Sequence, residues 1–177
     1  YQDGERRSLS FSLYNETGKY TPSVDRFWAG TRLRLDMGLE MGDTSVIWFR
    51  KGVFVVSEAS PSLSPSERTV SVSAKDKYSL FDDKTGALPL TYTIPVGEDI
   101  RSVIESIMMA DMGNGYPFDS QPLIFHPSLK GKTVQAEITG SAGQTYGNIL
   151  SELATQLSAE IFYNAAGNLT VIPTTLT

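Results

Sequence analysis

Residues 145–172 read TYGNILSELATQLSAEIFYNAAGNLTVI and join a helix pattern to a hairpin pattern. Apolar side chains recur at helical spacing in the first part, and they are Tyr146, Ile149, Leu150, Leu153, Ala154 and Leu157. Thr145 precedes them and is suited to be the N-cap. Two β-rich runs, 160–163 and 169–172, flank a turn that contains Gly167. The sequence predicts a helix followed by a closing β-hairpin.

A second helix is predicted earlier in the same half of the chain. Ile100, Val103, Ile104 and Ile107 stand at helical spacing, and Glu98-Asp99 opens the run with the negative charge that suits a helix N-terminus. The helix should end near Gly113, because the following GNGYP is a sequence of turn formers. Residues 92–95 before it read as a short extended segment, so this half is predicted to be α+β.

The first half of the chain has the period-two alternation of half-buried strands. Alternating runs cover residues 7–14, 33–39 and 70–74, and residues 15–23 have the composition of an exposed loop. We interpret residues 45–49 and 53–56 as two strands of a hairpin, with Arg50-Lys51-Gly52 as its turn. Five strands predict a small barrel or sandwich.

Together these patterns predict a mainly β protein of the α+β class in two parts. Residues 1–90 are predicted to form a small β-barrel or sandwich domain. Residues 91–177 are predicted to form an α+β unit of two helices and a C-terminal hairpin, which continues downstream. Because the chain starts at Tyr1, a few residues before a strand pattern, we expect it to be an internal piece of a longer protein.

Composition excludes several classes of function. The 177 residues carry 20 acidic and 15 basic side chains, for a net charge of −5. Without a basic stripe, counterion release cannot drive phosphate binding, so we expect no sequence-specific nucleic-acid binding. The absence of cysteine excludes disulfides and thiolate metal sites. No stretch reaches the roughly 20 apolar residues of a membrane span.

Catalytic patterns are incomplete. His126 is the only histidine, and its FHP setting predicts a structural role in a loop rather than a general base, which leaves a hydrolase as the weakest reading. Gly131-Lys132-Thr133 resembles the end of a phosphate-binding loop, but His126 stands where that motif needs its first glycine. We therefore expect no enzyme, and no catalytic or cofactor-binding residue.

Acidic residues give no metal or glycosidase site either. The segment that starts at Asp111 resembles a calcium loop, yet Gly113 and Gly115 occupy positions that need oxygen ligands, so we interpret it as a helix-stop turn. The neighbours Asp82-Asp83 and Glu98-Asp99 read as a solvated loop and a helix N-terminus. No metal or cofactor is expected.

A short resemblance supports a different class of function. The phrase YTIPVGEDI, from Tyr92 to Ile100, is similar to the opening of a LysM glycan-binding repeat, where an extended Tyr-Thr segment runs through a glycine turn into a helix. Phe27-Trp28 could also stack on a sugar. The alternative function is therefore a glycan- or receptor-binding module of a tail or surface protein.

A longer resemblance covers most of the chain. Its phrases, in order, are RSLSFSL (7–13), GKYTP (18–22), FWAG (27–30), LRLDMGL (33–39), WFRKGVFVVS (48–57), the segment 92–107, KGKT (130–133) and the helix-and-hairpin segment 145–170. In this order they resemble the N-terminal hub region of phage and prophage tail-tip, or baseplate hub, proteins. These belong to the tail-associated lysin or endopeptidase family.

The resemblance implies a structural subunit that works by assembly. Such hubs close the distal end of the tail tube as homotrimers, with two tube-like β domains per subunit, and anchor cell-wall-degrading or receptor-binding regions. It implies contacts with further copies of the same chain, with the distal tail protein or tail tube ring, and with the tape measure protein. The expected location is the tail tip of the virion, after assembly in the bacterial cytoplasm. No catalytic residue is carried over.

Overall fold

The computed structural model describes residues 7–20, 29–63 and 68–174. It divides into two compact units, Tyr1–Lys77 and Tyr78–Thr177. From sequence we placed the domain boundary after residue 90. In the structure the boundary between the two units lies earlier, after Lys77, because Tyr78, Phe81 and Leu88 are buried in the core of the second unit.

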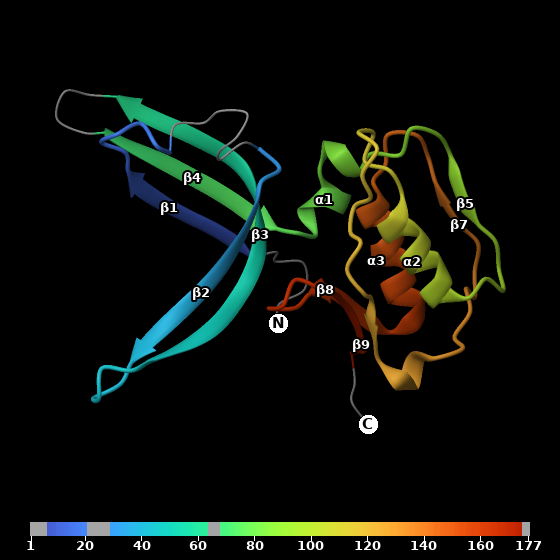
Figure 1. The fold of residues 1–177 in the computed structure, drawn as a ribbon. Helices are drawn as coiled ribbons and strands as arrows, with labels where there is room; N and C mark the ends of the chain where they lie inside the picture. The colour runs from blue at the N-terminus through green and yellow to red at the C-terminus, as the bar shows by residue number, and fades with distance from the viewer. Residues whose placement is uncertain (1–6, 21–28, 64–67, 175–177) are drawn as a thin grey trace. The chain divides into compact units, whose positions relative to one another are not determined.

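Unit 1 is a single antiparallel sheet that curls into part of a barrel (Figure 1). Its strands run in the order β1-β4-β3-β2. Their bounds are Ser8–Tyr14 for β1, Arg32–Glu40 for β2, Val46–Leu63 for β3 and Arg68–Asp76 for β4. Four strands are therefore present among the described residues of this unit, where the sequence predicted five.

The predicted hairpin within residues 45–56 is wrong. Arg50, Lys51 and Gly52 lie inside the long strand β3, and the chain turns before it, between Met41 and Ser45. Gly52 is absent from the residues with positive φ, so it supplies no turn conformation. Instead Leu35 pairs with Gly52 and Asp36 with Arg50, which leaves Lys51 as the extra residue of a β-bulge.

The predicted alternation gives the sheet of unit 1 two unlike faces. Val56, Val70 and Val72 form a buried cluster on one face. Phe11 and Leu33, on neighbouring strands, pack against this cluster. The opposite face carries serines, which stand directly across from one another in the pairs Ser10–Ser73 and Ser12–Ser71. Burial of the apolar cluster on the first face stabilises this small unit.

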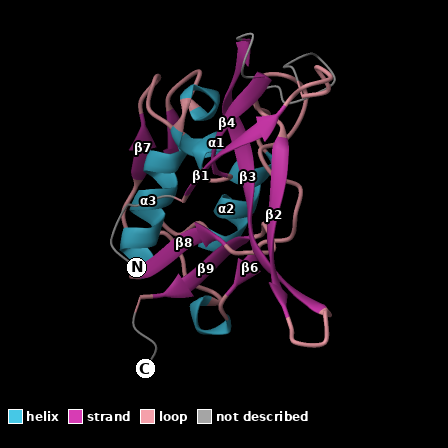
Figure 2. Ribbon diagram, turned by 90° about the vertical axis from the view of Figure 1, so that its left-hand side faces the viewer, coloured by secondary structure: helices cyan, strands magenta, loops and turns pink. Residues whose placement is uncertain are grey.

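Unit 2 contains two small sheets and a pair of packed helices. Its elements are α1 (Ser79–Asp82), β5 (Tyr92–Ile94), α2 (Ile100–Met109), β6 (Ile124–Phe125), β7 (Ile138–Gly140), α3 (Tyr146–Leu157), β8 (Ala159–Tyr163) and β9 (Leu169–Pro173), with short 3₁₀ turns at Lys84–Gly86 and Pro127–Leu129. β5 pairs with β7, while β6, β9 and β8 form the second sheet (Figure 2).

Both predicted helices are present, and Thr145 is the N-cap of the second, as predicted. Asp99 accepts a hydrogen bond from the Ser102 N–H at the start of α2, and Thr145 forms a reciprocal capping box with Asn148 at the start of α3. α2 ends at Met109, four residues before the predicted Gly113. The segment beyond it turns around the Asp111 carboxylate, which accepts hydrogen bonds from three successive backbone N–H groups.

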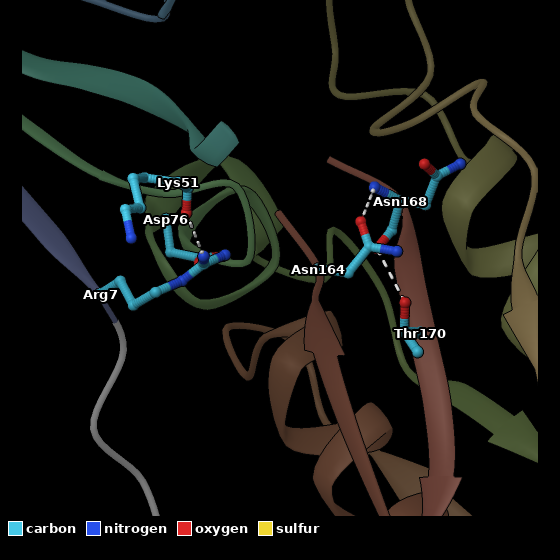
Figure 3. A network of polar contacts seen from close by, with 6 residues as sticks. All are labelled: Arg7, Lys51, Asp76, Asn164, Asn168 and Thr170. Atoms are coloured by element: carbon cyan, nitrogen blue, oxygen red, sulfur yellow. Dashed lines mark hydrogen bonds and ion pairs between the residues drawn. The ribbon is translucent and has the colours of Figure 1, made fainter. Parts of the chain in front are cut away.

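The closing hairpin is also confirmed. β8 and β9 pair antiparallel, and Asn164 holds the turn by accepting from the Asn168 N–H at 3.1 Å (Figure 3). β6 adds to β9 in parallel, a long-range pairing that no local pattern predicted. The predicted class, α+β and mainly β, is confirmed, with a curled sheet in unit 1 and, among the described residues, helices in unit 2 alone.

Candidate assembly surface

Among the described residues, several exposed apolar side chains gather on one two-stranded ribbon of unit 1. β2 and β3 extend together beyond β1 and β4 (Figure 1), and we call residues 36–50 of this ribbon the arm. Seven large apolar side chains of the arm are between two fifths and two thirds exposed, namely Met37, Leu39, Met41, Val46, Ile47, Trp48 and Phe49. Soluble monomers rarely leave such a cluster uncovered, so it indicates a contact surface.

Both faces of the arm are apolar. The pairs Met37–Phe49 and Leu39–Ile47 stand on one face, while Trp48 and Val46 stand on the other. Trp48 is 67% exposed and lies across the strands from Gly38. A Cβ at Gly38 would lie 2.8 Å from Val46 Cγ1 and 3.1 Å from Trp48 Cζ3, so the absence of a side chain there leaves room for the indole.

The backbone edges of the arm are open as well. β4 pairs with β3 only from Phe54 onward, so within the described residues β3 has a single neighbour, β2, along residues 46–53. β2 is also the edge strand of the sheet, and β1 is the opposite edge. A two-stranded ribbon is only marginally stable in water. Open edges and apolar faces together favour a partner along the arm.

A polar clamp fixes the base of the arm. The Arg7 guanidinium bonds Asp76 Oδ2 through Nε at 2.8 Å and through Nη2 at 2.7 Å, and it donates from Nη1 to the Lys51 carbonyl at 3.0 Å (Figure 3). Lys51 is the bulge residue, so this contact holds the point at which the strand bends. Gly52 leaves room for the clamp, since a Cβ there would lie 3.1 Å from Arg7 Nη1.

Charged groups frame the apolar part of the arm. At its base, Arg34 donates to Asp36 at 2.7 Å, and Arg50 lies 3.7 Å from the same carboxylate. At its tip, Asp43 accepts from both the hydroxyl and the N–H of Ser45. These hydrogen bonds lower the pKa of the Asp43 carboxyl from its ordinary value, the hydroxyl contributing most. The tip is therefore anionic and locally ordered.

His126 and the segment Gly131-Lys132-Thr133, which partly match catalytic motifs, make local contacts in the structure. His126 begins the turn Pro127–Leu129, where its Nδ1 lies 2.8 Å from the Ser128 hydroxyl oxygen. Lys132 accepts from the Ile100 N–H through its carbonyl, so Gly131-Lys132-Thr133 supports the start of α2.

The acidic residues considered as metal or glycosidase candidates are not grouped into one site. Asp82 lies against the first turn of α3, because a Cβ at Gly147 would collide with its carboxylate, while Asp99 is used as a helix cap. In the described part of the chain, no three His, Asp or Glu residues are grouped to hold a metal ion. No helix there is long and apolar enough to cross a membrane. Phe27 and Trp28 lie outside the described residues.

Sequence reasoning missed the arm, although a signal was present. Val46, Ile47, Trp48 and Phe49 are four consecutive apolar residues, and in a strand such a run must place apolar side chains on both faces. We interpreted the run as one strand of a short hairpin and assigned it no role in contacts.

Comparisons with known proteins show similarity in fold alone. No family model matches the sequence, and no curated protein matches it significantly. The structure is similar to the 43 kDa tail protein of prophage MuSo2 from Shewanella oneidensis, with a TM-score of 0.54 and 20% identity over 96% of this chain and 47% of that protein.

Two more distant matches are a tail protein from Neisseria meningitidis MC58 and prophage tail protein gp18 from Listeria monocytogenes EGD-e. Their TM-scores are 0.45 and 0.40, their identities 13% and 12%, and they cover 73% and 82% of this chain. The chain spans 35% and 42% of those proteins, so it is less than half the length of all three. The chain therefore has a fold that is also found in a prophage tail protein.

Proposed function

We propose that this chain is part of a phage tail protein, and more specifically of the hub at the tail tip, where it acts by assembly as a homotrimer and has no active site. The arm carries this proposal, because its exposed apolar faces and open edges are features of a surface that becomes buried in a complex. The fold likeness to a prophage tail protein supports the same role.

In the described part of unit 1, β1 and β2 are the two edges of the sheet, and they suit assembly into a ring. β1 and β2 have 7 and 9 residues, and each carries apolar side chains on one face and polar ones on the other. Since neighbouring strands of the sheet alternate in direction, β2 of one copy and β1 of the next would pair antiparallel and continue both faces. Such head-to-tail contacts close into rings when the rotation permits.

The proposal extends to partners by the resemblance in the sequence. The chain spans 47% of the MuSo2 tail protein, which leaves room for the second tube-like domain expected in a hub subunit. Three copies with two such domains each would match a hexameric ring of the distal tail protein or tail tube. The tape measure protein and the downstream lysin or receptor-binding region are further proposed neighbours, at the tail tip of the virion.

Engineered cysteines can test the edge pairing, since the natural chain has none. Ser10→Cys on β1 is combined with Arg32→Cys, Arg34→Cys or Asp36→Cys on β2, which samples three registers on one face. Within one copy these strands are separated by two others, roughly 14 Å, which is beyond the reach of a disulfide. We expect one double variant to give, on oxidation, a covalent species of three chains.

The single-cysteine variants are the controls. If they cross-link as readily as the double variants, the contact is isologous and the ring is refuted. A double variant that stays monomeric at every register, at concentrations where the unmodified protein is trimeric by light scattering, would also contradict the edge pairing.

The second candidate function is glycan binding through the LysM-like segment from Tyr92 to Ile100. The structure shows the strand, the glycine turn and the helix of that phrase in β5, Gly97 and α2. Sedimentation with purified peptidoglycan separates the two functions. We expect the chain to stay in the supernatant, and saturable pelleting that is lost on Tyr92→Ala would favour the glycan module.

A further inference from the structure

Two segments of unit 2, residues 84–109 and 130–155, have the same order of structural features. Each contains a short strand, a turn with a glycine of positive φ, and an amphipathic helix. Gly97 has φ 96° and Gly143 has φ 88°, and the second follows the first by 46 residues. Only three residue types coincide at this spacing, at Lys84/Lys130, Thr93/Thr139 and the two glycines. No repeat is therefore visible in the sequence.

The hydrogen bonds between the segments are reciprocal. Gly97 donates to the Val134 carbonyl at 2.9 Å, and Gly143 donates to the Leu88 carbonyl at 3.0 Å. In return, the Val134 N–H donates to the Glu98 carbonyl at 2.9 Å, and the Leu88 N–H donates to the Gln144 carbonyl at 2.7 Å. The two sets of bonds are equivalent, because each residue in one set lies 46 positions from its counterpart in the other set. Gly97 corresponds to Gly143, and Val134 corresponds to Leu88.

Strand pairing obeys the same relation. Thr93 faces Thr139, and the flanking pairs are Tyr92–Gly140 and Ile94–Ile138. If each residue is replaced by its counterpart 46 positions away, the pair Tyr92–Gly140 becomes Ile138–Ile94, and the reverse also holds. The two strands are therefore related by a local twofold axis that passes between the two threonines. The isolated bridges Asp99–Thr133 and Ala87–Thr145 are exchanged in the same way.

The helices correspond position by position. Their N-caps, Asp99 and Thr145, both accept from the N–H three residues later. Each helix buries matching positions toward the common core, namely Val103, Ile104 and Ile107 in α2 and Ile149, Leu150 and Leu153 in α3. α2 and α3 pack against one another, as do β5 and β7 (Figure 1).

We infer that unit 2 is built on an internal duplication, in which two interchangeable strand–turn–helix copies dock reciprocally around a local twofold axis. Leu88 and Val134, each on the extended segment before its own strand, are the anchors. Each anchor is buried and hydrogen-bonded to the glycine turn of the other copy. The two copies therefore hold each other, and the helix pair and β5–β7 follow from that exchange.

The side chains around the two anchors compensate one another in size. Leu88 is close to Gly140 and Ile149, because a Cβ at residue 140 would lie 2.5 Å from Leu88 Cδ1 and 3.1 Å from Ile149 Cδ1. The equivalent site around the other anchor has the smaller residue Val134, with Ile94 in place of the glycine and Val103 in place of Ile149. The larger anchor, Leu88, is therefore found with the smaller strand residue, Gly140. The smaller anchor, Val134, is found with the larger strand residue, Ile94.

The duplication also gives the LysM-like segment a structural role. Two polar groups of its turn, the Gly97 N–H and the Glu98 carbonyl, are both bonded to Val134 of the same chain. The strand, turn and capped helix occur again in the second copy, where the phrase is not recognisable. The segment is therefore one half of a self-docking pair, and its turn binds the chain's own anchor in place of a glycan.

Transplanting one anchor site into the other tests the interchange. The triple variant L88V/G140I/I149V gives the site around residue 88 the composition Val, Ile, Val that the site around Val134 has at Val134, Ile94 and Val103. We expect it to fold with a Tm within about 5 °C of the natural chain. Gly140→Ile alone should lower Tm by about 10 °C or more or prevent folding, because its side chain meets Leu88 and Ile149.

Circular dichroism melts and two-dimensional NMR spectra give the readout, with Ile149→Val alone as a control for the smaller helix residue. Rescue of the Gly140→Ile defect by the two accompanying changes supports the interchange. A triple variant as destabilised as Gly140→Ile would overturn it. Neither result depends on trimer formation, so the outcome is separate from that of the hub proposal.

Discussion

Replacing Trp48 with serine should weaken assembly while leaving the folded chain intact. A tryptophan can bury roughly 250 Å², and Trp48 is 67% exposed, so a partner could cover about 170 Å² more. At about 25 cal/mol per Å², full coverage would contribute about 4 kcal/mol for each site. Because each 1.4 kcal/mol is about a tenfold change in Kd, loss of the indole should weaken association by about 10²- to 10³-fold.

Sedimentation velocity over a concentration series measures this association. Tyr116→Ser is the matched control, because Tyr116 is 69% exposed in unit 2 and lies away from the arm in the chain. We expect Trp48→Ser to shift the dissociation midpoint and Tyr116→Ser to leave it unchanged, with both Tm values within about 3 °C of the natural chain. Equal effects of the two changes, or no effect of Trp48→Ser, would refute the assignment of the arm as the assembly surface.

Three further changes probe single contacts. Asp76→Asn should lower the free energy of unfolding of unit 1 by about 2 kcal/mol in urea titrations, less than for a fully buried pair, because the Arg7 side chain is 31% exposed; an unchanged midpoint would contradict the clamp. Gly86→Ala should cost about 2–3 kcal/mol, because a Cβ would collide with the backbone of α1, whereas Gly42→Ala, with open space around it, should be neutral. The lowered pKa of Asp43 means that its hydrogen bonds stabilise the arm tip above the ordinary value of 3.8 and are lost as pH falls through the lowered pKa; NMR amide shifts at the tip should move below pH 3.8 and stay flat above it.

Local patterns were sufficient where an element depends on its own residues. The α3 helix carries its cap in Thr145 and its apolar stripe from Tyr146 onward, so its bounds could be predicted closely. The same holds for β1 and for the β8–β9 hairpin, whose turn residues are adjacent to the strands they join. Their signals are local because the hydrogen bonds and the burial pattern repeat within one element.

The arm could not be assigned in the same way. Gly52 resembles a turn residue in sequence, but its role is to leave space for Arg7, which is distant along the chain. The part of β3 before Phe54 has no second neighbour because β4 ends at Asp76, close to where the chain passes into unit 2. The run of four apolar residues at 46–49 indicates apolar side chains on both faces, but whether anything packs on Trp48 depends on the tertiary structure.

The helix-and-hairpin run at residues 145–172 was predictable from the sequence alone, and so was the mainly β class, because periodicity is a local property. Tertiary structure alone decided which strand edges stay open and which segments dock. Leu88 and Val134 became a reciprocal pair because two copies with only three matching residue types share a backbone path. Strand pairing joins residues far apart in sequence, and its energy depends on backbone groups that are alike in every residue type.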